Sequence, residues 1–263
     1  MIRAERIFKQ FGEQEVLKGI DFTFEAGKTN LIIGRSGAGK TVLLKILVGL
    51  FNPTKGHVWY NDIDITTQSR KQLQAIRKDV GMLFQGNALF DSMTIEENIR
   101  FPMDMFTKMT KKEKKRRVDE VLERVSLKDV LVKYPSEISG GMQKRVGIAR
   151  SIVLQPKYLF CDEPNSGLDP KTAITIDELI RDITIEQNIT TIINTHDMNS
   201  VMEIGDNICL LSKGLLVWKG AKEEVLDESN EKLQDFIFAS PFLYKLVEAA
   251  RGNPKIDIED ILD

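Results

Sequence analysis

The chain has 263 residues, and its 37 lysines and arginines nearly balance its 39 aspartates and glutamates. This length suits one large domain, or one domain with a small appendage, and the balanced charge gives no overall field that would favour nucleic acid as a partner. Because the charged start of the chain is not a signal peptide and no apolar stretch approaches the roughly 18–20 residues of a membrane span, we expect a cytoplasmic protein that reaches a membrane only through a partner.

Short apolar strands punctuated by glycine and proline run along most of the chain. The expected strands span residues 16–17, 20–24, 29–33, 57–60, 80–85, 158–161, 190–194 and 208–211. Strands that alternate with helices imply a largely parallel sheet covered on both faces. We therefore expect an α/β fold with an antiparallel N-terminal β region and a charged helical subdomain inserted at about residues 91–154.

The two cysteines, Cys161 and Cys209, lie far apart in the sequence. They match no metal-ligand spacing. We expect both to be buried as small apolar residues in a protein of a reducing compartment.

Residues 34–41 read Gly-Arg-Ser-Gly-Ala-Gly-Lys-Thr, which fits the phosphate-binding pattern G-x-x-x-x-G-K-[ST]. An apolar run precedes them and a helix-like apolar segment follows, which is the context that such a P-loop needs. Backbone N–H groups could hold phosphate oxygens, with Lys40 on the β- and γ-phosphates and Thr41 on Mg²⁺. The alternative is a glycine-rich turn with a surface lysine. The candidate ATP contacts are Gly34, Arg35, Ser36, Gly37, Ala38, Gly39, Lys40 and Thr41.

A second candidate element is the run of four apolar residues at 158–161 that ends in two carboxylates, Asp162 and Glu163. A buried strand of this kind can deliver Asp162 to the Mg²⁺ shell beside a P-loop. Glu163 is then placed to polarise an attacking water molecule. The alternative is an acidic pair that belongs to an ordinary turn.

The third element is Ser139-Gly140-Gly141, which opens a segment with apolar residues at helical spacing. A serine and two glycines at a helix start form a second anion-binding N-terminus. Ser139, Gly140 and Gly141 are therefore further candidate nucleotide contacts. A plain helix cap is the alternative.

The P-loop, the Ser-Gly-Gly helix start, the Asp-Glu pair and the stretch Ser166-Gly167-Leu168-Asp169-Pro170 occur in this order. Over roughly residues 1–222 the combination resembles the nucleotide-binding subunit of ABC transporters. The resemblance implies that two copies pair head to tail, with ATP and Mg²⁺ between the P-loop of one copy and the Ser-Gly-Gly helix of the other. It also implies a separate membrane-spanning permease, which would hold the protein at the cytoplasmic face of the inner membrane. Residues 223–263 remain as a C-terminal helical tail.

The resemblance also assigns roles to single residues. Gln85 would sense Mg²⁺ and the membrane partner, and His196 would reach the γ-phosphate. Asp169 would cross the dimer interface, and Phe11 stands where the family stacks an aromatic ring on adenine. Without the resemblance, Phe11 would be an ordinary apolar residue and His196 a histidine with satisfied hydrogen bonds. The implied catalytic set is Glu163, His196 and Gln85, and the implied metal set is Thr41, Gln85 and Asp162.

The signature departs from the usual Leu-Ser-Gly-Gly-Gln, because Ile138 precedes Ser139 and Met142 replaces the glutamine. Met142 cannot form the hydrogen bonds of glutamine. Ile-Ser-Gly-Gly-Met, together with the stretch at 81–90, resembles the ATPases of the Mla, or MCE-associated, lipid-transport systems of double-membraned bacteria. This resemblance implies phospholipid transport between the inner and outer membranes, with MCE-domain lipid-binding and accessory subunits as partners.

Three features beyond these motifs lead to expectations. Apolar residues between Gln85 and Met105 exceed what one helix face can bury, so some are expected to receive the coupling helix of a partner. These are Leu89, Phe90, Met93, Ile95, Ile99, Phe101 and Met103. The basic run at 111–117 suits either phospholipid headgroups or, more simply, a solvated helix face. The apolar tail after residue 230 either caps the sheet or contacts a neighbouring subunit.

Two other functions compete with that of a transporter motor. A soluble ABC-type protein of translation or DNA repair would carry two cassettes or a long coiled-coil insertion, and this chain has neither. A P-loop kinase or GTPase would leave the Ser-Gly-Gly helix and His196 without a role. Co-purification with a membrane protein would separate the first function from the other two.

Overall fold

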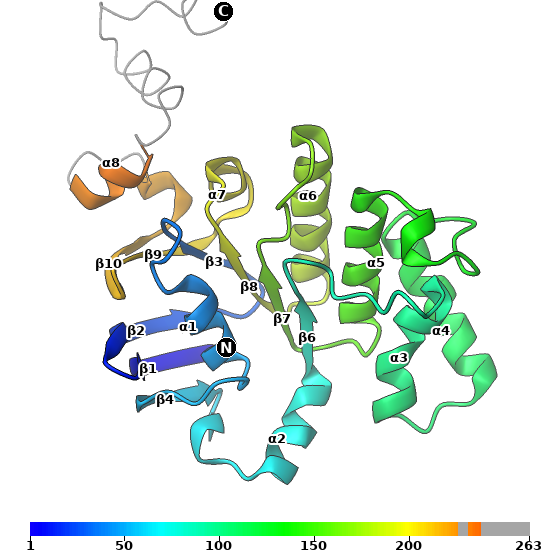
Figure 1. Cartoon of the computed structure of the whole chain (residues 1–263), viewed down its shortest axis with the longest axis horizontal. Helices are drawn as coiled ribbons and strands as arrows, with labels where there is room; N and C mark the ends of the chain where they lie inside the picture. The colour runs from blue at the N-terminus through cyan, green and yellow to red at the C-terminus, as the bar shows by residue number, and fades with distance from the viewer. Residues whose placement is uncertain (226–230, 238–263) are drawn as a thin grey trace, which may run out of the picture.

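The computed structural model describes residues 1–225 and 231–237 and arranges them as two sheets with helices around them (Figure 1). The smaller sheet is antiparallel, with the strand order β2-β1-β4-β5. Its strands are β1 (Ile2–Phe11), β2 (Gln14–Phe24), β4 (Lys55–Tyr60) and β5 (Ile63–Asp64). It is the antiparallel N-terminal region that the sequence predicts.

The sequence pattern does not predict strand β1, because a bulge interrupts its alternation. Ile2, Ala4 and Ile7 are buried, so the inward positions are first two and then three residues apart. Arg6 takes up the extra position with a φ of 46°, where the pairing of β1 with β2 shifts register. A strict period of two fails at this point, although the strand continues on both sides of it.

The larger sheet has the strand order β10-β9-β3-β8-β7-β6. Its strands are β3 (Thr29–Ile33), β6 (Val80–Leu83), β7 (Tyr158–Asp162), β8 (Thr190–Thr195), β9 (Asn207–Ser212) and β10 (Leu215–Gly220). All neighbours run parallel except β10, which pairs antiparallel with β9. Strands β3, β7 and β8 are buried at every position, as strands covered on both faces must be. Strand β10 escapes prediction because its positions are half-buried or exposed.

The parallel strands deliver three chain segments to one edge of the larger sheet. Thr195 pairs with Ile33, and Asn194 pairs with Asp162. Because parallel strands end at the same edge, the residues that follow them meet there. The P-loop candidate follows β3, Glu163 follows β7, and His196 follows β8.

Helices pack on both faces of the larger sheet. They are α1 (Lys40–Leu47), α2 (Arg70–Ile76), α3 (Ile95–Phe106), α4 (Lys111–Arg124), α5 (Gly140–Ile152), α6 (Pro170–Glu186), α7 (Met198–Ile204) and α8 (Glu231–Ile237). Short 3₁₀ turns lie at Ile65–Thr67, Arg77–Asp79, Pro135–Glu137 and Lys222–Glu224. Within the described residues, no helix is long and apolar enough to cross a membrane.

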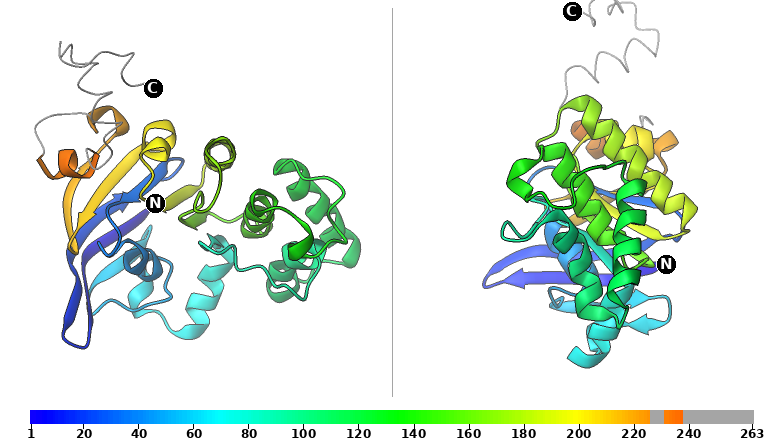
Figure 2. Two further views of the ribbon diagram at one scale, coloured as in Figure 1. Left: turned by 45° about the horizontal axis from the view of Figure 1, so that its top comes forward. Right: turned by 90° about the vertical axis from the view of Figure 1, so that its right-hand side faces the viewer.

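Helices α3, α4 and α5 follow one another between β6 and β7 and stand together at one side of the molecule (Figures 1 and 2). Thr94 and Thr110 begin α3 and α4 with capping boxes, in which Glu97 and Glu113 return a hydrogen bond to the cap residue. These caps fix where the two helices start. The three helices lie inside the helical subdomain that we propose for residues 91–154.

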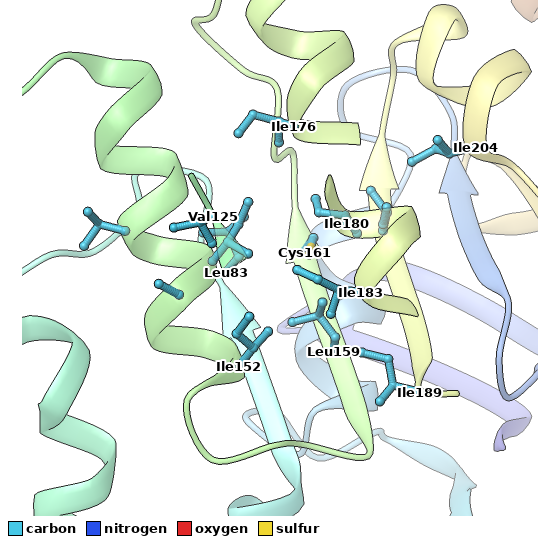
Figure 3. Close-up of a cluster of buried hydrophobic side chains, with 14 of the residues drawn as sticks. Leu83, Val125, Ile152, Leu159, Cys161, Ile176, Ile180, Ile183, Ile189 and Ile204 are labelled. Atoms are coloured by element: carbon cyan, nitrogen blue, oxygen red, sulfur yellow. The ribbon is translucent and has the colours of Figure 1, made fainter. Parts of the chain in front are cut away.

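Two apolar cores lie on opposite faces of the larger sheet. Strand β7 shows the division, because Leu159 and Cys161 pack into one core and Phe160 into the other, as the period of a strand requires. The first core joins the sheet to the helices from α3 to α7. Figure 3 shows its part around β6, β7 and α6. The second packs α1 against both sheets. Cys161 and Cys209 are buried and free, as the sequence predicts, and burial raises the pKa of both thiols.

Only the beginning of the tail is described. Helix α8 packs beside β10, where Leu233 is buried in the first core, so this part of the tail caps the sheet. The guanidinium of Arg35 in the P-loop donates to the backbone carbonyl of Asp235 at 2.8 Å. The apolar residues further along the tail, Phe242, Leu246 and Val247, lie outside the described residues.

Candidate active site

The P-loop candidate forms the turn from β3 to α1, and glycine is required at several of its positions. Gly34, Gly37 and Gly39 have positive φ angles of 146°, 79° and 104°. A Cβ atom on Gly34 would collide with the carbonyl oxygen of Leu211, and one on Gly39 would press on the side chain of Leu17. The turn therefore depends on these glycines, and it ends at the N-terminus of α1.

Lys40, the first residue of α1, is 5% exposed and folds back over the loop. Its Nζ donates to the carbonyl of Gly34 at 2.8 Å and to that of Arg35 at 3.4 Å. Burial lowers the pKa of Lys40, while the nearby carboxylates of Glu163 and Asp162 favour its charged form. A cation thus lies inside the loop, with carbonyl groups as its partners, where it could neutralise phosphate.

Thr41 and Asp162 meet at the edge of the sheet, and Asn194 joins them. The hydroxyl of Thr41 donates to Asp162 Oδ1 at 3.3 Å. Asn194 Nδ2 donates to the same Oδ1 at 2.6 Å and to the hydroxyl of Thr41 at 3.1 Å. No role is predicted for Asn194 from the sequence, although a polar residue that ends an apolar strand at this edge indicates a possible site residue.

These oxygen atoms suit Mg²⁺, which prefers hydroxyl and carboxylate oxygens and keeps several waters. Asn194 Oδ1, the end of the amide that does not contact Thr41 or Asp162, is buried and has no hydrogen-bond partner among the described residues, so a polar acceptor near the pair is left unsatisfied. No group of three His, Cys, Asp or Glu side chains that could hold a metal occurs in the described part of the chain. This small set of protein oxygens fits an ion that is held by few protein ligands and by the phosphates of the substrate.

Glu163 is the point where the three predicted catalytic residues come together. Its Oε2 accepts a hydrogen bond from Gln85 Nε2 at 3.0 Å, and its Oε1 lies 3.2 Å from His196 Nδ1. The backbone of Glu163 has a φ of 48°, which is uncommon for a residue with a side chain. Its N–H donates to the carbonyl of Asn194 at 2.8 Å, which helps to hold this conformation. Gln85 lies against Glu163, and its expected role toward Mg²⁺ stays a prediction.

Lys144 links the Ser-Gly-Gly helix to the segment of Gln85, a contact that the sequence pattern does not predict. Only 3% of this lysine is exposed, and its Nζ donates to the backbone carbonyl of Gln85 at 2.7 Å. Burial lowers the pKa of Lys144. A movement of α5 would therefore shift the backbone at Gln85, whose side chain contacts Glu163.

The second phosphate-binding candidate lies apart from the P-loop. Ser139 caps α5, with its hydroxyl accepting a hydrogen bond from the N–H of Met142 at 3.3 Å. Ser139 and Gly141 line a hollow of about 420 Å³, together with the basic residues Lys128 and Arg145. Helices α1 and α5 stand apart in both Figure 1 and Figure 2. The P-loop and the Ser139 helix start therefore do not face each other within one chain.

Phe11 and Asp169 lie where the resemblance requires accessible residues. Phe11 is 44% exposed at the end of β1, and its ring meets that of Phe51 edge-on at 5.9 Å. Asp169 caps α6, and hydrogen bonds from the side chain and backbone of Thr172 lower the pKa of its carboxyl. Stacking on adenine and a role across a dimer interface stay predictions for these two residues.

A buried polar cluster connects the segment after Glu163 to the helix after His196. Asn165 Nδ2 donates to Asp177 Oδ2 at 2.7 Å and to the hydroxyl of Ser200 at 3.0 Å. Burial raises the pKa of Asp177 to about 6, against the opposing hydrogen bonds from Ser200 and Asn165, and the negative charges of Asp197 and Glu203 raise it further. The carboxyl is thus more easily protonated in the folded chain than in the unfolded chain.

Stability should therefore fall as pH rises through the range from about 4 to about 6, because the folded state binds a proton that the unfolded state has lost. We expect Asp177→Asn to match the wild type at about pH 4 and to exceed it at about pH 8 by up to about 3 kcal/mol in unfolding free energy. Denaturant unfolding at both pH values measures this. Asp182→Asn, an exposed change on the same helix, is the control, and an equal gain at both pH values would contradict the prediction.

These features define a class of protein, the P-loop nucleotide-binding proteins of the ABC type. A P-loop, an acidic pair at the end of a neighbouring strand and a separate glycine-opened helix are its parts. The sequence profile of the ABC transporter family matches residues 17–166, and the chain belongs to that family.

The chain is similar to curated proteins over most of its length. It is 38% identical over 236 residues to a probable ribonucleotide transport ATP-binding protein, mkl, of Mycobacterium tuberculosis, covering 90% of this chain and 66% of that protein. It is 41% identical over 211 residues to the methionine import ATP-binding protein MetN of Carboxydothermus hydrogenoformans, covering 80% and 62%. The chain thus spans slightly less than two thirds of the length of these relatives.

Solved structures share the fold. The dimeric structure of MJ0796, a bacterial ABC transporter cassette, has a TM-score of 0.79 and 30% identity and covers 84% of this chain and 99% of that chain. The same cassette is known in a post-hydrolysis state with ADP and phosphate. CbiO1 of Clostridium perfringens, part of the cbiONQ transporter complex, has a TM-score of 0.80 and 30% identity, covering 94% and 98%. The predicted ABC-type fold is confirmed.

Proposed function

We propose that this chain is the ATP-hydrolysing subunit of a transporter in which two copies share two ATP sites and a separate permease spans the membrane. The observation that supports this best is the convergence of Gln85 and His196 on the carboxylate of Glu163, at the edge where Lys40 and Asp162 also lie. A carboxylate oriented by two neighbours and placed beside a phosphate-binding loop can direct water at a phosphoryl group.

Each group has a distinct task in this proposal. Glu163 orients the attacking water, and Gln85 and His196 fix the direction of its carboxylate. The ammonium group of Lys40, which donates to the carbonyl of Gly34 in this structure, would contact the β- and γ-phosphates and neutralise part of their negative charge. Mg²⁺ held by Thr41 and Asp162 would supply a positive charge that offsets the negative charge developing on the phosphates.

The separation of the two phosphate-binding devices supports a head-to-tail dimer. The Ser139 helix start of one copy would serve the ATP bound to the P-loop of the other. Asp169, at the N-terminus of α6, would then lie at the interface, and Phe11 would stack on adenine. The similar cassette MJ0796 has a dimeric structure, which supports pairing of two copies here.

A groove between the larger sheet and α3 suits the permease. It has a volume of about 360 Å³ and is mostly apolar, with Phe84, Phe90 and Phe101 in its lining and Arg77 and Arg150 at polar positions. The rings of Phe90 and Phe101 lie 4.8 Å apart. Of the seven apolar residues that the sequence singles out, Ile95, Ile99 and Met103 are fully buried in the first core, on the inner face of α3. Phe90 and Phe101 are members of the same set that line the groove. A short amphipathic helix of the permease is the occupant that such a groove fits.

The substrate that we propose is phospholipid moving between the inner and outer membranes, with MCE-domain lipid-binding and accessory subunits as further partners. The Ile138–Met142 signature and the stretch at 81–90 support it. The two relatives, by contrast, are named for other substrates, ribonucleotides and methionine. In this proposal the chain sits at the cytoplasmic face of the inner membrane, bound to the permease, and takes no nucleic acid as a partner.

We expect Phe90→Asp to uncouple ATP turnover from transport, because a charge in the groove opposes docking of an apolar helix. The isolated subunit should keep its turnover, whereas turnover of the complex with its copurifying membrane subunit in vesicles should stop responding to phospholipid. Ile185→Asp, at a position 57% exposed on α6 outside the groove, is the matched control.

The same vesicles test the substrate. In the wild-type complex we expect stimulation by phospholipid and a lipid-binding partner, and none by methionine or ribonucleotides. Stimulation by one of those solutes alone would remove the lipid assignment and leave the transporter assignment in place. An unchanged response in Phe90→Asp would remove the groove from the proposal.

A further inference from the structure

Asn194 occupies a position from which one side chain reaches two of the three proposed metal ligands, Thr41 and Asp162. It lies on β8 between β3 and β7, paired with Ile32 on one side and with Asp162 on the other. The residue is fully buried. A buried amide at the end of an otherwise apolar strand needs partners, and the two it has are Thr41 and Asp162.

The chemistry of the partners fixes which way the amide points. Asp162 Oδ1 is an acceptor, so it must face the NH₂ end of Asn194. Both hydrogens of that NH₂ are then used, one on Asp162 at 2.6 Å and one on the hydroxyl of Thr41 at 3.1 Å. Reversing the amide would place two acceptors against each other, so Oδ1 is left as the free end.

These bonds also orient the hydroxyl of Thr41. It accepts from Asn194 and donates to Asp162. A hydroxyl has two lone pairs, so one lone pair is left over for another partner. Without Asn194, the hydroxyl could rotate and the carboxylate of Asp162 would lose its shortest hydrogen bond.

The other end of the amide is a buried acceptor. Asn194 Oδ1 has no partner among the described residues, which is costly for a polar atom away from solvent. Mg²⁺ usually keeps several waters, which are strong hydrogen-bond donors. An acceptor fixed beside two metal ligands is the arrangement that such a water needs.

We propose that Asn194 is a positioning residue of the Mg²⁺ site, which holds Thr41 and Asp162 through Nδ2 and accepts a hydrogen bond from the hydration shell of the ion through Oδ1. The inference rests on the proposed Mg²⁺ site. It predicts that Asn194 affects how strongly metal and nucleotide support each other, while metal-free nucleotide binding depends on the P-loop alone.

Two variants of equal shape separate this role from simple packing. Asn194→Val removes both polar ends, whereas Asn194→Thr has the same outline and keeps one hydroxyl that can donate or accept. Thr191→Val is the matched control, because it removes a buried hydrogen bond of the same strand, the 2.6 Å contact to Thr184, three residues away from Asn194.

The measurement is the affinity for a non-hydrolysable ATP analogue by calorimetry, once in EDTA and once with excess Mn²⁺ as the metal probe. In EDTA we expect all variants to bind within about twofold of the wild type. With Mn²⁺ we expect Asn194→Val to bind about 10-fold or more weakly, which is the usual effect of losing such a supporting residue. Asn194→Thr should lose less, and Thr191→Val nothing. Thermal unfolding confirms that each variant is folded.

The outcomes are distinct. A loss of affinity for the ATP analogue that occurs only with Mn²⁺ supports the proposal. If the Val variant folds poorly, an affinity of the Thr variant between those of the wild type and the Val variant, again only with Mn²⁺, also supports it. Equal losses with and without Mn²⁺ overturn it, since Asn194 would then only support the fold of the loop. A Val variant that binds as the wild type does also overturns it. If Mn²⁺ gives the wild type no gain, the proposed metal site fails together with this role.

Discussion

Glu163→Gln is expected to bind ATP as the wild type does and to lose turnover by at least about 100-fold, the usual contribution of a general base. Glutamine has the shape of glutamate, so the contacts with Gln85 and His196 change little in geometry. The amide has no negative charge with which to attract a proton from water, so the step that cleaves the γ-phosphate should stop. Steady-state phosphate release and ATP affinity, measured on the same preparation, test this.

A matched control is Glu178→Gln, an exposed position on α6, which should change neither quantity. The accompanying expectation is a dimer that stays closed on ATP, visible as a shift in size-exclusion chromatography. Turnover of Glu163→Gln close to that of the wild type would show that another group directs the water.

Ser139→Arg and Lys40→Ala should each abolish hydrolysis in a dimer of identical copies, for different reasons. Lys40→Ala removes a buried charge that would contact phosphate, at a cost of roughly 2–5 kcal/mol. Ser139→Arg places a long cation at the start of α5 and obstructs the closure of two copies on each other. A dimer with Lys40→Ala in one copy and Ser139→Arg in the other should keep one intact site, because both defects fall in the same composite site.

The decisive comparison is with a dimer that carries both changes in one copy beside a wild-type copy. If sites are shared, each of its two sites has one defect and it should be inactive. If each chain works alone, the order is reversed, and the dimer with both changes in one copy is the active one. Selection with two different affinity tags isolates both dimers, and phosphate release from each gives the answer.

The parts of the candidate site that could be predicted from the sequence are those made of consecutive residues. Residues 34–41 carry their own geometry, because the glycines specify the turn and Lys40 follows it in the chain. Asp162 and Glu163 could be placed beside the P-loop because they end an apolar run, and parallel strands end at a common edge. His196 was assigned through the family resemblance, and it also directly follows a parallel strand.

What escaped prediction depends on contacts between distant segments. Lys144 looks like one basic residue of a charged helix, and only the packing of α5 against the segment of Gln85 makes it a buried partner. Asn194 can be seen in the sequence as a polar residue that ends an apolar strand, but its contact with Asp162 is evident only once β7 and β8 are paired in register. In β1 the bulge at Arg6 breaks the period that a sequence reading relies on.

The burial of both cysteines has a practical consequence for spectroscopy. A thiolate must attack the maleimide for labelling to occur. Cys161 and Cys209 lie inside the two cores, and burial raises the pKa of both thiols. The native chain should therefore behave as if it had no reactive thiol, and a single cysteine introduced at an exposed residue can carry a fluorophore without removal of the natural pair. A label at exposed Asp169 would place a dye where two copies are proposed to meet, so that their approach could be followed in real time.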